Sequence, residues 1–367
     1  MLLRRLHLIN FKNHEELTWD FDRINCITGS NGVGKTNVLD AVYYLSLCKS
    51  FFNSTDQQNI RHNESFFLCA GNYENEAQKF TVQLGIKRNT KKSLKKDGAE
   101  YEKLSHHIGL VPLVIITPFD IQLVHEHSEE RRKFMDGLLS QTDREYLETL
   151  QHYNRLIDQR NRALKHFAAQ NIIDFDLLDT YDAQLAPLAQ SIYQKRVSFF
   201  KDFLPIFSEK YTLISGGAEN AGVSYESHLH GTDFLSLMKN TLKTDRVLER
   251  TTKGIHKDDW KFTLDDMAVK KYASQGQTKS FVIALKLAQY QYLKNATGKL
   301  PLLLLDDIFE KLDAQRAAQL MQLVATDDFG QIFITDTHRD RVEGVFEPMG
   351  IQPCYFELQT AAVATQA

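Results

Sequence analysis

The residues of this chain most suited to chemistry form a glycine-rich run between positions 29 and 36. The run fits G-x-x-x-x-G-K-[ST] at every fixed position, and its members are Gly29, Ser30, Asn31, Gly32, Val33, Gly34, Lys35 and Thr36. Glycines permit a tight turn whose backbone N–H groups point at phosphate oxygens, and a following helix offers its positive end to them. We therefore predict a P-loop that binds a nucleotide. Lys35 is expected on the β- and γ-phosphates and Thr36 on Mg²⁺.

Two neighbouring carboxylates are expected to complete this site. Asp306 and Asp307 directly follow the leucine run 302–305. Such a run is typical of a buried parallel strand, and open α/β sheets bind ligands at the carboxyl ends of their strands. This is the Walker B pattern, which predicts that Asp306 supports Mg²⁺ and that Asp307 orients or activates the attacking water. The alternative is a buried strand that ends in a solvated turn.

A third motif immediately precedes a periodic segment expected to be a helix over 278–293. It consists of Ser274, Gln275, Gly276 and Gln277. A serine hydroxyl and a glycine N–H at a helix N-terminus form a surface that can bind phosphate. Because the chain already has a P-loop, a second γ-phosphate sensor is useful if it serves the ATP of a neighbouring subunit. A plain helix cap explains the four residues equally well.

The elements that must position these groups follow from periodicity. Strands are expected at 2–11, 23–28, 79–86, 110–117, 260–264 and 331–334, and a helix at 37–45 after the P-loop. Helical stripes cover 128–170 and 178–203, joined by a turn at 171–176 and interrupted at Arg160. Thr142 is expected to be an N-cap with Glu145 reaching back, and Pro187 to kink the second helix. The stripes fit either a helical core or a partner surface.

These elements predict an α/β protein in which a helical region is inserted between the P-loop and the acidic pair. We expect the N-terminal part of the nucleotide domain at 1–125, the helical arm at 126–245, the C-terminal part at 246–360 and a flexible tail at 361–367.

The composition is that of an ordinary globular protein, with 43% hydrophobic and 25% charged residues. The net charge of −3 gives no general support for nucleic-acid binding, so any such role must come from local patches. Four scattered cysteines suggest neither a zinc site nor a disulfide framework. We expect a cytoplasmic protein without a signal peptide or membrane span.

The order of P-loop, insertion, S-x-G-Q and acidic pair resembles the ATP-binding-cassette and SMC-type ATPases. Further segments narrow the resemblance to the RecF family over nearly the whole chain. They are LINFKN at 8–13, RRKFMD at 131–136, YNR through QRN at 153–161, GIHKDD at 254–259 and LLDD at 304–307 with Leu312-Asp313 after it. Departures from the family pattern occur at Ile255, Lys257, 118–120, 126–128 and 310–311, outside the P-loop and the acidic pair.

The resemblance implies an ABC/SMC-type ATPase head with an inserted, mainly helical arm, called lobe II. It also implies ATP with Mg²⁺, an ATP-dependent homodimer, slow DNA-stimulated ATP hydrolysis, and binding to single-stranded, double-stranded or gapped DNA. RecR- and RecO-like mediators would be partners in recombinase loading during DNA replication, repair and the SOS response. His338 follows the strand at 331–334 and fits a switch residue facing the γ-phosphate, although a solvated histidine fits as well.

The densest basic run, 87–96, supplies the candidates for DNA contact. They are Arg88, Lys91, Lys92, Lys95 and Lys96, before an Asp97-Gly98 hairpin turn signal. The basic residues of 131–133 are weaker candidates. A charge run is also typical of a solvated sheet edge. The sequence has no recognition-helix motif and no aromatic residues interleaved with the basic ones. Sequence-specific contacts with DNA are therefore not expected.

Two other function classes fit the P-loop. A transporter ATPase subunit is disfavoured by the long helical insertion and by the lack of a recognisable coupling segment. A nuclease or topoisomerase-like enzyme is disfavoured because few residues follow the acidic pair. The favoured interpretation is an ATP-gated DNA-binding switch.

Overall fold

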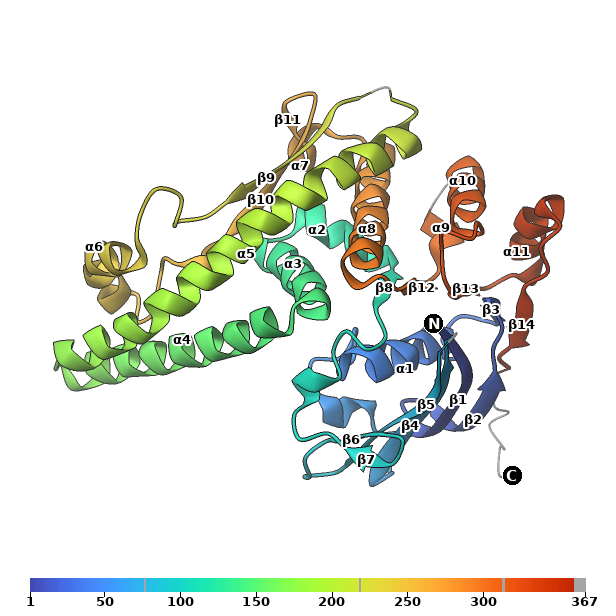
Figure 1. Cartoon of the computed structure of the whole chain (residues 1–367), viewed down its shortest axis with the longest axis horizontal. Helices are drawn as coiled ribbons and strands as arrows, with labels where there is room; N and C mark the ends of the chain where they lie inside the picture. The colour runs from blue at the N-terminus through green and yellow to red at the C-terminus, as the bar shows by residue number, and fades with distance from the viewer. Residues whose placement is uncertain (76, 218, 312–313, 360–367) are drawn as a thin grey trace, which may run out of the picture. The chain divides into compact units, whose positions relative to one another are not determined.

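The computed structural model describes residues 1–75, 77–217, 219–311 and 314–359 of the chain. Contacts divide the chain into two compact units (Figure 1), the first formed by residues 1–120 and those from 289 on, the second by residues 121–288. Residues 246–288, which the sequence analysis grouped with the nucleotide domain, here pack with the helical region. The expected tail, 361–367, lies outside the described residues.

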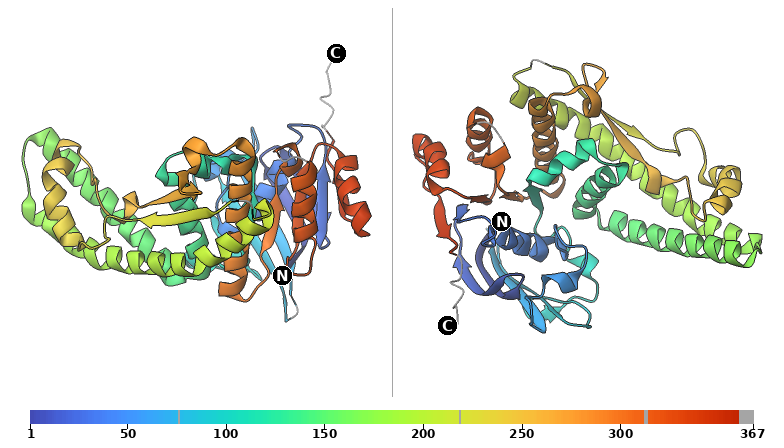
Figure 2. Two further views of the ribbon diagram at one scale, coloured as in Figure 1. Left: turned by 90° about the horizontal axis from the view of Figure 1, so that it is seen from above. Right: turned by 180° about the vertical axis from the view of Figure 1, so that it is seen from behind.

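The first unit contains one antiparallel and one parallel sheet (Figures 1 and 2). The antiparallel sheet has the order β2-β1-β4-β5-β6-β7, with β1 Leu2–Phe11, β2 His14–Asp20, β4 Phe66–Glu74, β5 Lys79–Lys87, β6 Ser93–Lys96 and β7 Ala99–Glu100. The parallel sheet has the order β14-β3-β13-β12-β8, with β3 Ile24–Thr28, β8 Leu113–Ile116, β12 Leu302–Leu305, β13 Ile332–Asp336 and β14 Cys354–Glu357. Strands β3, β8, β12 and β13 are buried along their whole length. This burial explains why β8 and β12 are continuous apolar runs and why β3 and β13 are mostly apolar.

Helix α1, Lys35–Leu47, contacts strands of both sheets and shares one hydrophobic core with them. Val38 and Leu45 of this helix are fully buried in that core, beside Leu6 of β1 and Leu304 of β12. The remaining helices of the unit are α9 Ile308–Lys311, α10 Ala314–Val324 and α11 Arg339–Phe346, with short 3₁₀ turns at η1 Asp56–Asn59, η2 Leu104–His106, η3 Pro118–Ile121 and η5 Glu347–Met349. This packing fixes the start of α1 against the ends of β3, β12 and β13.

Two long antiparallel helices dominate the second unit, α4 Arg144–Gln170 and α5 Phe175–Ser215. The predicted helices and their turn are confirmed, and α5 continues as one helix through Pro187 and Pro205. Asn171 ends α4 in the left-handed conformation, which asparagine tolerates better than most residues. The other helices are α2 Gln122–His125, α3 Ser128–Thr142, α6 Phe234–Val247, α7 Val269–Tyr272 and α8 Gln275–Thr297, which runs on into the first unit.

A small antiparallel sheet, ordered β11-β10-β9, completes this unit. Its strands are β9 Ala221–Glu226, β10 Asp259–Leu264 and β11 Met267–Ala268, and the 3₁₀ turn η4 Ile255–Lys257 precedes β10. Trp260 of β10 packs edge-on against Phe134 of α3 and Phe200 of α5. This aromatic cluster joins the sheet to the helices.

The expected N-cap at Thr142 is wrong. Helix α3 runs through Thr142, whose hydroxyl donates to the carbonyl of Leu139. Asp143 is the only residue left between α3 and α4, and its carboxylate accepts the N–H of Tyr146 at 2.9 Å. Glu145 pairs with Lys195 instead of closing a capping box.

Among the residues that the structure describes, no helix has both the length and the apolar character needed to cross a membrane.

Candidate nucleotide-binding site

The glycine-rich run forms a loop between the end of β3 and the start of α1. Gly29, Gly32 and Gly34 have φ angles of 149°, 82° and 109°, a region that side chains disfavour. A Cβ on Gly34 would collide with the amide of Asn13, whereas at Gly32 nothing lies within 4 Å. The loop therefore combines a backbone that needs glycine with open space at its tip. This is the shape that phosphate groups require.

Lys35 is buried, although it is charged. Its ammonium donates to the carbonyl oxygens of Gly29 at 2.8 Å and Ser30 at 3.1 Å, so it lies across the loop. A buried ammonium needs such partners or an anion. Lys35 is thus in place to exchange loop carbonyls for phosphate oxygens.

Asp306 links the P-loop to two strands of the parallel sheet. Its Oδ1 accepts the hydroxyl of Thr36 at 2.9 Å and the hydroxyl of Thr335 at 2.8 Å. Burial raises the pKa of Asp306, while these hydrogen bonds and Lys35 act in the opposite direction. Thr36 and Asp306 are therefore brought together as the sequence predicts.

Asp307 has a left-handed backbone, with φ 44°. Its N–H donates to the hydroxyl of Thr335 at 2.9 Å, so Thr335 contacts both acidic residues. A non-glycine residue in this region is uncommon and is often found at functional sites. Sequence reasoning missed the role of Thr335, although its place at the end of β13, next to β12, was available as a signal.

His338 lies just after β13, as the N-cap residue of α11. Its N–H donates to Asp336 at 2.8 Å, and its side chain is exposed. Asp336 also pairs with Arg341 at 3.3 Å. This pairing orders the β13–α11 turn, and the switch role of His338 stays a prediction.

Asn13, in the β1–β2 turn, and His14, at the start of β2, also hold the loop and were missed by sequence reasoning. The amide of Asn13 donates to the carbonyl of Val33 at 2.8 Å and accepts from Asn37 at 2.7 Å. The Nε2 atom of buried His14 lies 3.1 Å from the carbonyl oxygen of Gly34. Burial lowers the pKa of His14, which favours the neutral ring. The β1–β2 turn thus supports the P-loop from the side.

The S-Q-G-Q motif lies in the second unit, at the start of α8. The Ser274 N–H donates to Gln277 Oε1 at 2.6 Å, and the Gln277 N–H donates to Ser274 Oγ at 3.2 Å. This reciprocal pair is a capping box. Gln277 also donates to Glu219 at 2.6 Å. Gln275 and Gly276 fall in the first turn of the helix, so the cap interpretation of the motif describes the geometry of this single chain.

The basic hairpin, residues 87–96, spans the end of β5, a turn and β6. Lys92 turns inward, where its ammonium contacts the carbonyl of Cys48, pairs with Asp56 at 2.9 Å and lies over the ring of Tyr44. Arg88 is exposed, and its Nε donates to the carbonyl of Glu64 at 2.7 Å. Lys91 is exposed and Lys95 half-buried.

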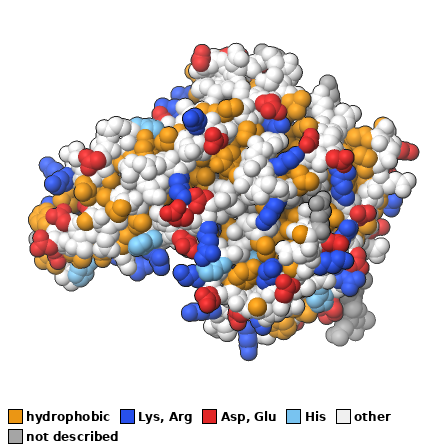
Figure 3. Space-filling view, viewed as in Figure 1, with side chains coloured by type: hydrophobic (Ala, Val, Ile, Leu, Met, Phe, Trp, Pro, Cys, Tyr) orange, Lys and Arg blue, Asp and Glu red, His pale blue; other side chains and the backbone are white. Residues whose placement is uncertain are grey.

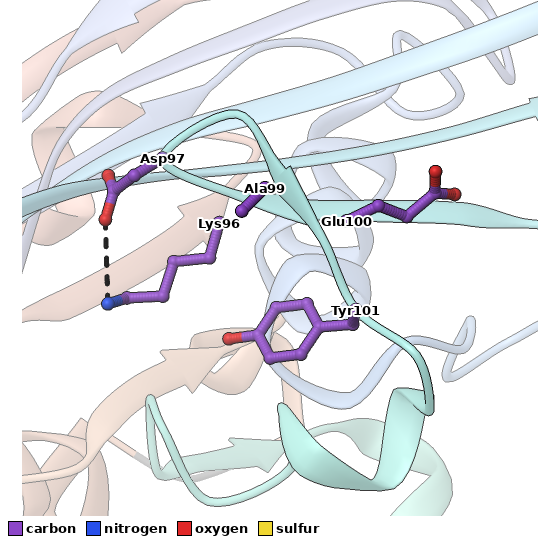
Figure 4. Close-up of a pocket in the computed structure, with 5 residues that line it drawn as sticks. All are labelled: Lys96, Asp97, Ala99, Glu100 and Tyr101. Carbon is purple, nitrogen blue, oxygen red and sulfur yellow. Dashed lines mark ion pairs between the residues drawn. The ribbon is translucent and has the colours of Figure 1, made fainter.

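Lys96 lines a shallow hollow on the same hairpin (Figure 4). Its ammonium pairs with Asp97 at 3.5 Å and lies over the Phe80 ring. The other lining residues are Ala99, Glu100 and Tyr101. With two carboxylates at its rim, the hollow is a poor site for phosphate.

The residues at the P-loop fit ATP with Mg²⁺. The hydroxyl of Thr36 and the carboxylate of Asp306 lie close enough to serve one hard cation through oxygen atoms. Among the described residues there is no cluster of three or more His, Cys, Asp or Glu that could hold a metal. A magnesium ion that also uses phosphate oxygens needs only one or two protein carboxylates.

A P-loop after β3 and an acidic pair after β12 of the same parallel sheet, where β13 lies between the two strands, together with a large helical insertion, define a P-loop ATPase head of the SMC type. Residues 2–354 match the family described as RecF/RecN/SMC N terminal domain. The DNA replication and repair protein RecF of Flavobacterium johnsoniae is 47% identical over 346 residues, covering 94% of this chain and 96% of that protein. The protein of the same name from Bacteroides fragilis is 42% identical over 365 residues, covering 99% and 98%. The chain belongs to the RecF family.

Solved structures agree with this assignment. The structure of the recombination mediator protein RecF-ATPrS in the RecFOR pathway has a TM-score of 0.88 and 26% identity, covering 98% of this chain and 96% of that chain. The corresponding RecF-ATP structure has a TM-score of 0.87 and 27% identity, covering 98% and 95%. The Smc head bound to the C-winged helix domain of ScpA has a TM-score of 0.55 at 15% identity, covering 94% and 91%, and shows the shared fold.

Proposed function

We propose that this protein is an ATP-dependent DNA-binding protein of replication and recombinational repair, and that it acts in the cytoplasm. The observation that carries the proposal is the contact between Thr36 and Asp306, which unites the P-loop with the acidic pair in a RecF-family chain. The relatives are named for DNA replication and repair, and two solved relatives are described as complexes with ATP or ATPrS. These comparisons favour a repair protein over a transporter subunit.

The residues at the site have separable roles. The P-loop N–H groups and Lys35 would bind the phosphates, and Thr36 and Asp306 would hold Mg²⁺, which would neutralise phosphate charge. Thr335 fixes Asp306 and the backbone of Asp307, so that the carboxylate of Asp307 can orient the attacking water. ATP hydrolysis is expected to be slow and to be stimulated by DNA.

Dimerisation is the step that would connect ATP to DNA. The Ser274 hydroxyl and the Gly276 N–H, at the start of α8, would contact the γ-phosphate bound by a second copy. ATP would then join two heads, and ADP would not. Among the described residues, the Ser274 hydroxyl accepts one hydrogen bond, a long one of 3.2 Å from the N–H of Gln277. It can therefore be diverted at low cost.

Local patches would bind DNA, because the charge as a whole does not favour it. On the face drawn in Figure 3, basic and acidic side chains are interspersed. On the basic hairpin, Arg88, Lys91 and Lys95 are the better candidates, since Lys92 and Lys96 have carboxylate partners. RecR- and RecO-like mediators are proposed partners in recombinase loading.

Sizing of the full chain tests the proposal. The protein should be monomeric with ADP and dimeric with ATP and Mg²⁺, and it should bind a gapped duplex more tightly with ATP than with ADP. A protein that stays monomeric with ATP and does not bind gapped DNA would contradict the proposed function.

A further inference from the structure

The loop that joins α6 to β10, residues 250–257, is anchored at its start by a buried arginine. The guanidinium of Arg160 donates to Asp245 at 2.8 Å and to the hydroxyl of Thr251 at 2.9 Å, and its side chain is fully buried. Asp245 in turn accepts the N–H of Thr252 at 2.9 Å, and Asn161 accepts the N–H of Thr251 at 2.7 Å. The first residues of this loop are therefore fixed from the interior of the second unit.

A second buried arginine anchors the end of the same loop. Arg196 donates to the carbonyl of Ile255 at 2.8 Å and to the carboxylate of Asp258 at 2.6 Å. His256 bridges to the start of the loop, with Nε2 3.1 Å from the carbonyl of Thr251 and Nδ1 2.9 Å from the hydroxyl of Tyr153. Burying two arginines is costly, and such ion pairs are better explained by the conformation that they fix than by the stability that they add.

The anchored loop carries three basic residues, Arg250, Lys253 and Lys257. Arg250 and Lys257 are exposed, and Lys253 is half-buried with its ammonium 2.9 Å from Nε2 of His228. Arg132 of α3 is held nearby, since it donates to the carbonyl of Asp258 at 2.8 Å. Burial, and then the charges of Arg250 and Arg132, lower the pKa of Lys257. Arg250 and Arg132 are thus close enough to Lys257 to repel it.

The neighbouring carboxylates form ion pairs with other basic residues. Glu129, whose charge acts on Lys257, pairs with Lys133 at 2.9 Å. Asp258 pairs with Arg196 and accepts the hydroxyl of Tyr225. Asp259 pairs with Arg131 at 2.6 Å. On an ordinary solvated surface the basic side chains of the loop could move apart. Here the anchored backbone of the 250–257 loop keeps them near one another.

Gly254 allows the loop to take this form. Its φ of 123° is unfavourable for any side chain, and a Cβ would lie 2.9 Å from the hydroxyl of Tyr153. The one large apolar residue of the loop, Ile255, is fully buried. The loop therefore presents backbone and cations without an apolar surface, which suits a polyanion better than a folded protein partner.

We propose that Arg250, Lys253 and Lys257, together with Arg132, form a binding site for the phosphate groups of a nucleic-acid backbone. This inference rests on the proposed DNA-binding function and gives it a second contact region, separate from the basic hairpin. Arg and Lys can contact guanine as well as phosphate. Because the site has no aromatic platform and no amide for other bases, we expect it to contact the backbone and not to read sequence.

The test compares two triple variants of the full chain that lose the same charge from the same unit. The site variant is Arg250→Ala, Lys253→Ala, Lys257→Ala. The control variant is Lys201→Ala, Lys239→Ala, Lys243→Ala, whose three lysines are exposed in the structure. Affinity for a gapped duplex is measured with ATP over a range of salt concentrations, with circular dichroism as a check on folding. The single Lys257→Ala variant serves if the triple variant does not fold.

We expect the site variant to bind the duplex at least about tenfold more weakly than the control, and its salt slope to fall by about 0.7–0.9 per lost phosphate contact. Equal affinities and slopes of the site and control variants would overturn the inference and leave the proposed function intact. A wild type that binds no DNA would overturn the proposed function itself. Val247 and Leu248 are exposed just before the loop and could belong to an interface with an acidic protein. Poly-glutamate is therefore a second probe, which stands for such a partner. Loss of poly-glutamate binding with unchanged DNA binding would overturn the inference in favour of an acidic protein partner.

Discussion

At the scale of single residues, Lys35 is the group on which nucleotide affinity depends most directly. Its ammonium already lies over the loop, bonded to two carbonyls that phosphate oxygens can replace. Lys35→Met removes this charge while keeping a long side chain. We expect tight ATP binding and DNA-stimulated ATP hydrolysis to be lost, as measured by calorimetry and phosphate release. Unchanged ATP affinity would contradict the assignment.

The two acidic residues should separate binding from hydrolysis. Asp306→Asn should weaken Mg²⁺-dependent ATP binding, because the carboxylate that bonds Thr36 is neutralised. Asp307→Asn should keep ATP binding, slow hydrolysis by roughly 100-fold or more and trap the ATP dimer. A magnesium titration and single-turnover hydrolysis measure both effects, with Asp340→Asn, exposed on α11, as the control. Equal hydrolysis rates in wild type and Asp307→Asn would refute the role of Asp307.

The sequence predicts the P-loop and the acidic pair because each is a contiguous motif with one geometry. It does not predict Thr335, Asn13 or His14. Thr335 reaches Asp306 only because β13 pairs with β12 in one particular register. Asn13 and His14 reach the loop only because the β1–β2 turn lies beside it. Such contacts depend on tertiary packing, which local patterns do not encode.

At the scale of elements, the 250–257 loop should make the second unit sensitive to acid. Burial lowers the pKa of His256 to about 3, from an ordinary value near 6.5. Below pH 6.5 the His256 ring binds a proton in the unfolded chain but not in the folded chain. This contribution to stability is therefore present above pH 6.5 and is lost as the pH falls toward 3.

His256→Gln tests this sensitivity. Chemical unfolding between pH 6 and 4 should show a pH slope that is smaller than that of wild type by up to about 1.4 kcal/mol per pH unit. His152→Gln, exposed on α4, is the matched control and should keep the slope of the wild type. If His256→Gln also keeps that slope, the loop is not held by a neutral histidine.

In the basic hairpin, different lysines are expected to affect protein stability and DNA binding. Lys92→Ala leaves Asp56 without its ion pair and should lower stability by about 1–3 kcal/mol. Lys91→Ala with Lys95→Ala should leave stability almost unchanged and weaken binding equally for all DNA sequences. Thermal unfolding and titration with two unrelated duplexes check this. If the double variant binds DNA like wild type, the hairpin is a solvated sheet edge.

Elements themselves were predictable where periodicity is long. Helix α4 and strands β1 and β5 follow the expected ranges closely. Helix α5 spans Phe175–Ser215 and so extends beyond the expected 178–203, mainly at its C-terminal end. Arg160 interrupts the apolar stripe of α4 in sequence, yet it lies in the interior with Asp182 and Asp245. A charged residue on an apolar face is read as a break in the pattern unless its distant partners are known.

At the scale of the whole molecule, the sequence indicates a large insertion between the two halves of the ATP site. The extent of the second unit was harder to predict, because β10 pairs with β9 across the 32 residues of 227–258.

Strand β10 pairs with β9 from Asp259 opposite Glu226 to Leu264 opposite Ala221. The sequence between them holds α6 and the 250–257 loop. No local pattern indicates this pairing, so the sequence alone does not predict that residues 246–288 pack with the helical region.

The prediction that concerns the whole assembly is that Ser274 acts on the ATP of a second copy. Ser274→Arg should leave ATP binding by the monomer nearly intact, because the P-loop is unchanged. It should abolish ATP-induced dimerisation and hydrolysis, because a long cation would replace the small hydroxyl at the interface. The substitution also removes a helix cap, worth about 1 kcal/mol. Ser274→Ala, which loses the cap and the hydroxyl without adding a cation, is therefore the control for stability.

Mixing two defective proteins gives the sharper form of this test. A heterodimer of Lys35→Met and Ser274→Arg chains has one site in which an intact P-loop faces an intact S-Q-G-Q motif, while the other site carries both lesions. If the motif works across the interface, the mixture should regain part of the ATPase activity that each variant lacks alone. ATP-dependent dimerisation of pure Ser274→Arg, measured by sizing, would decide against the role in trans, because the γ-phosphate would then join two heads without this serine.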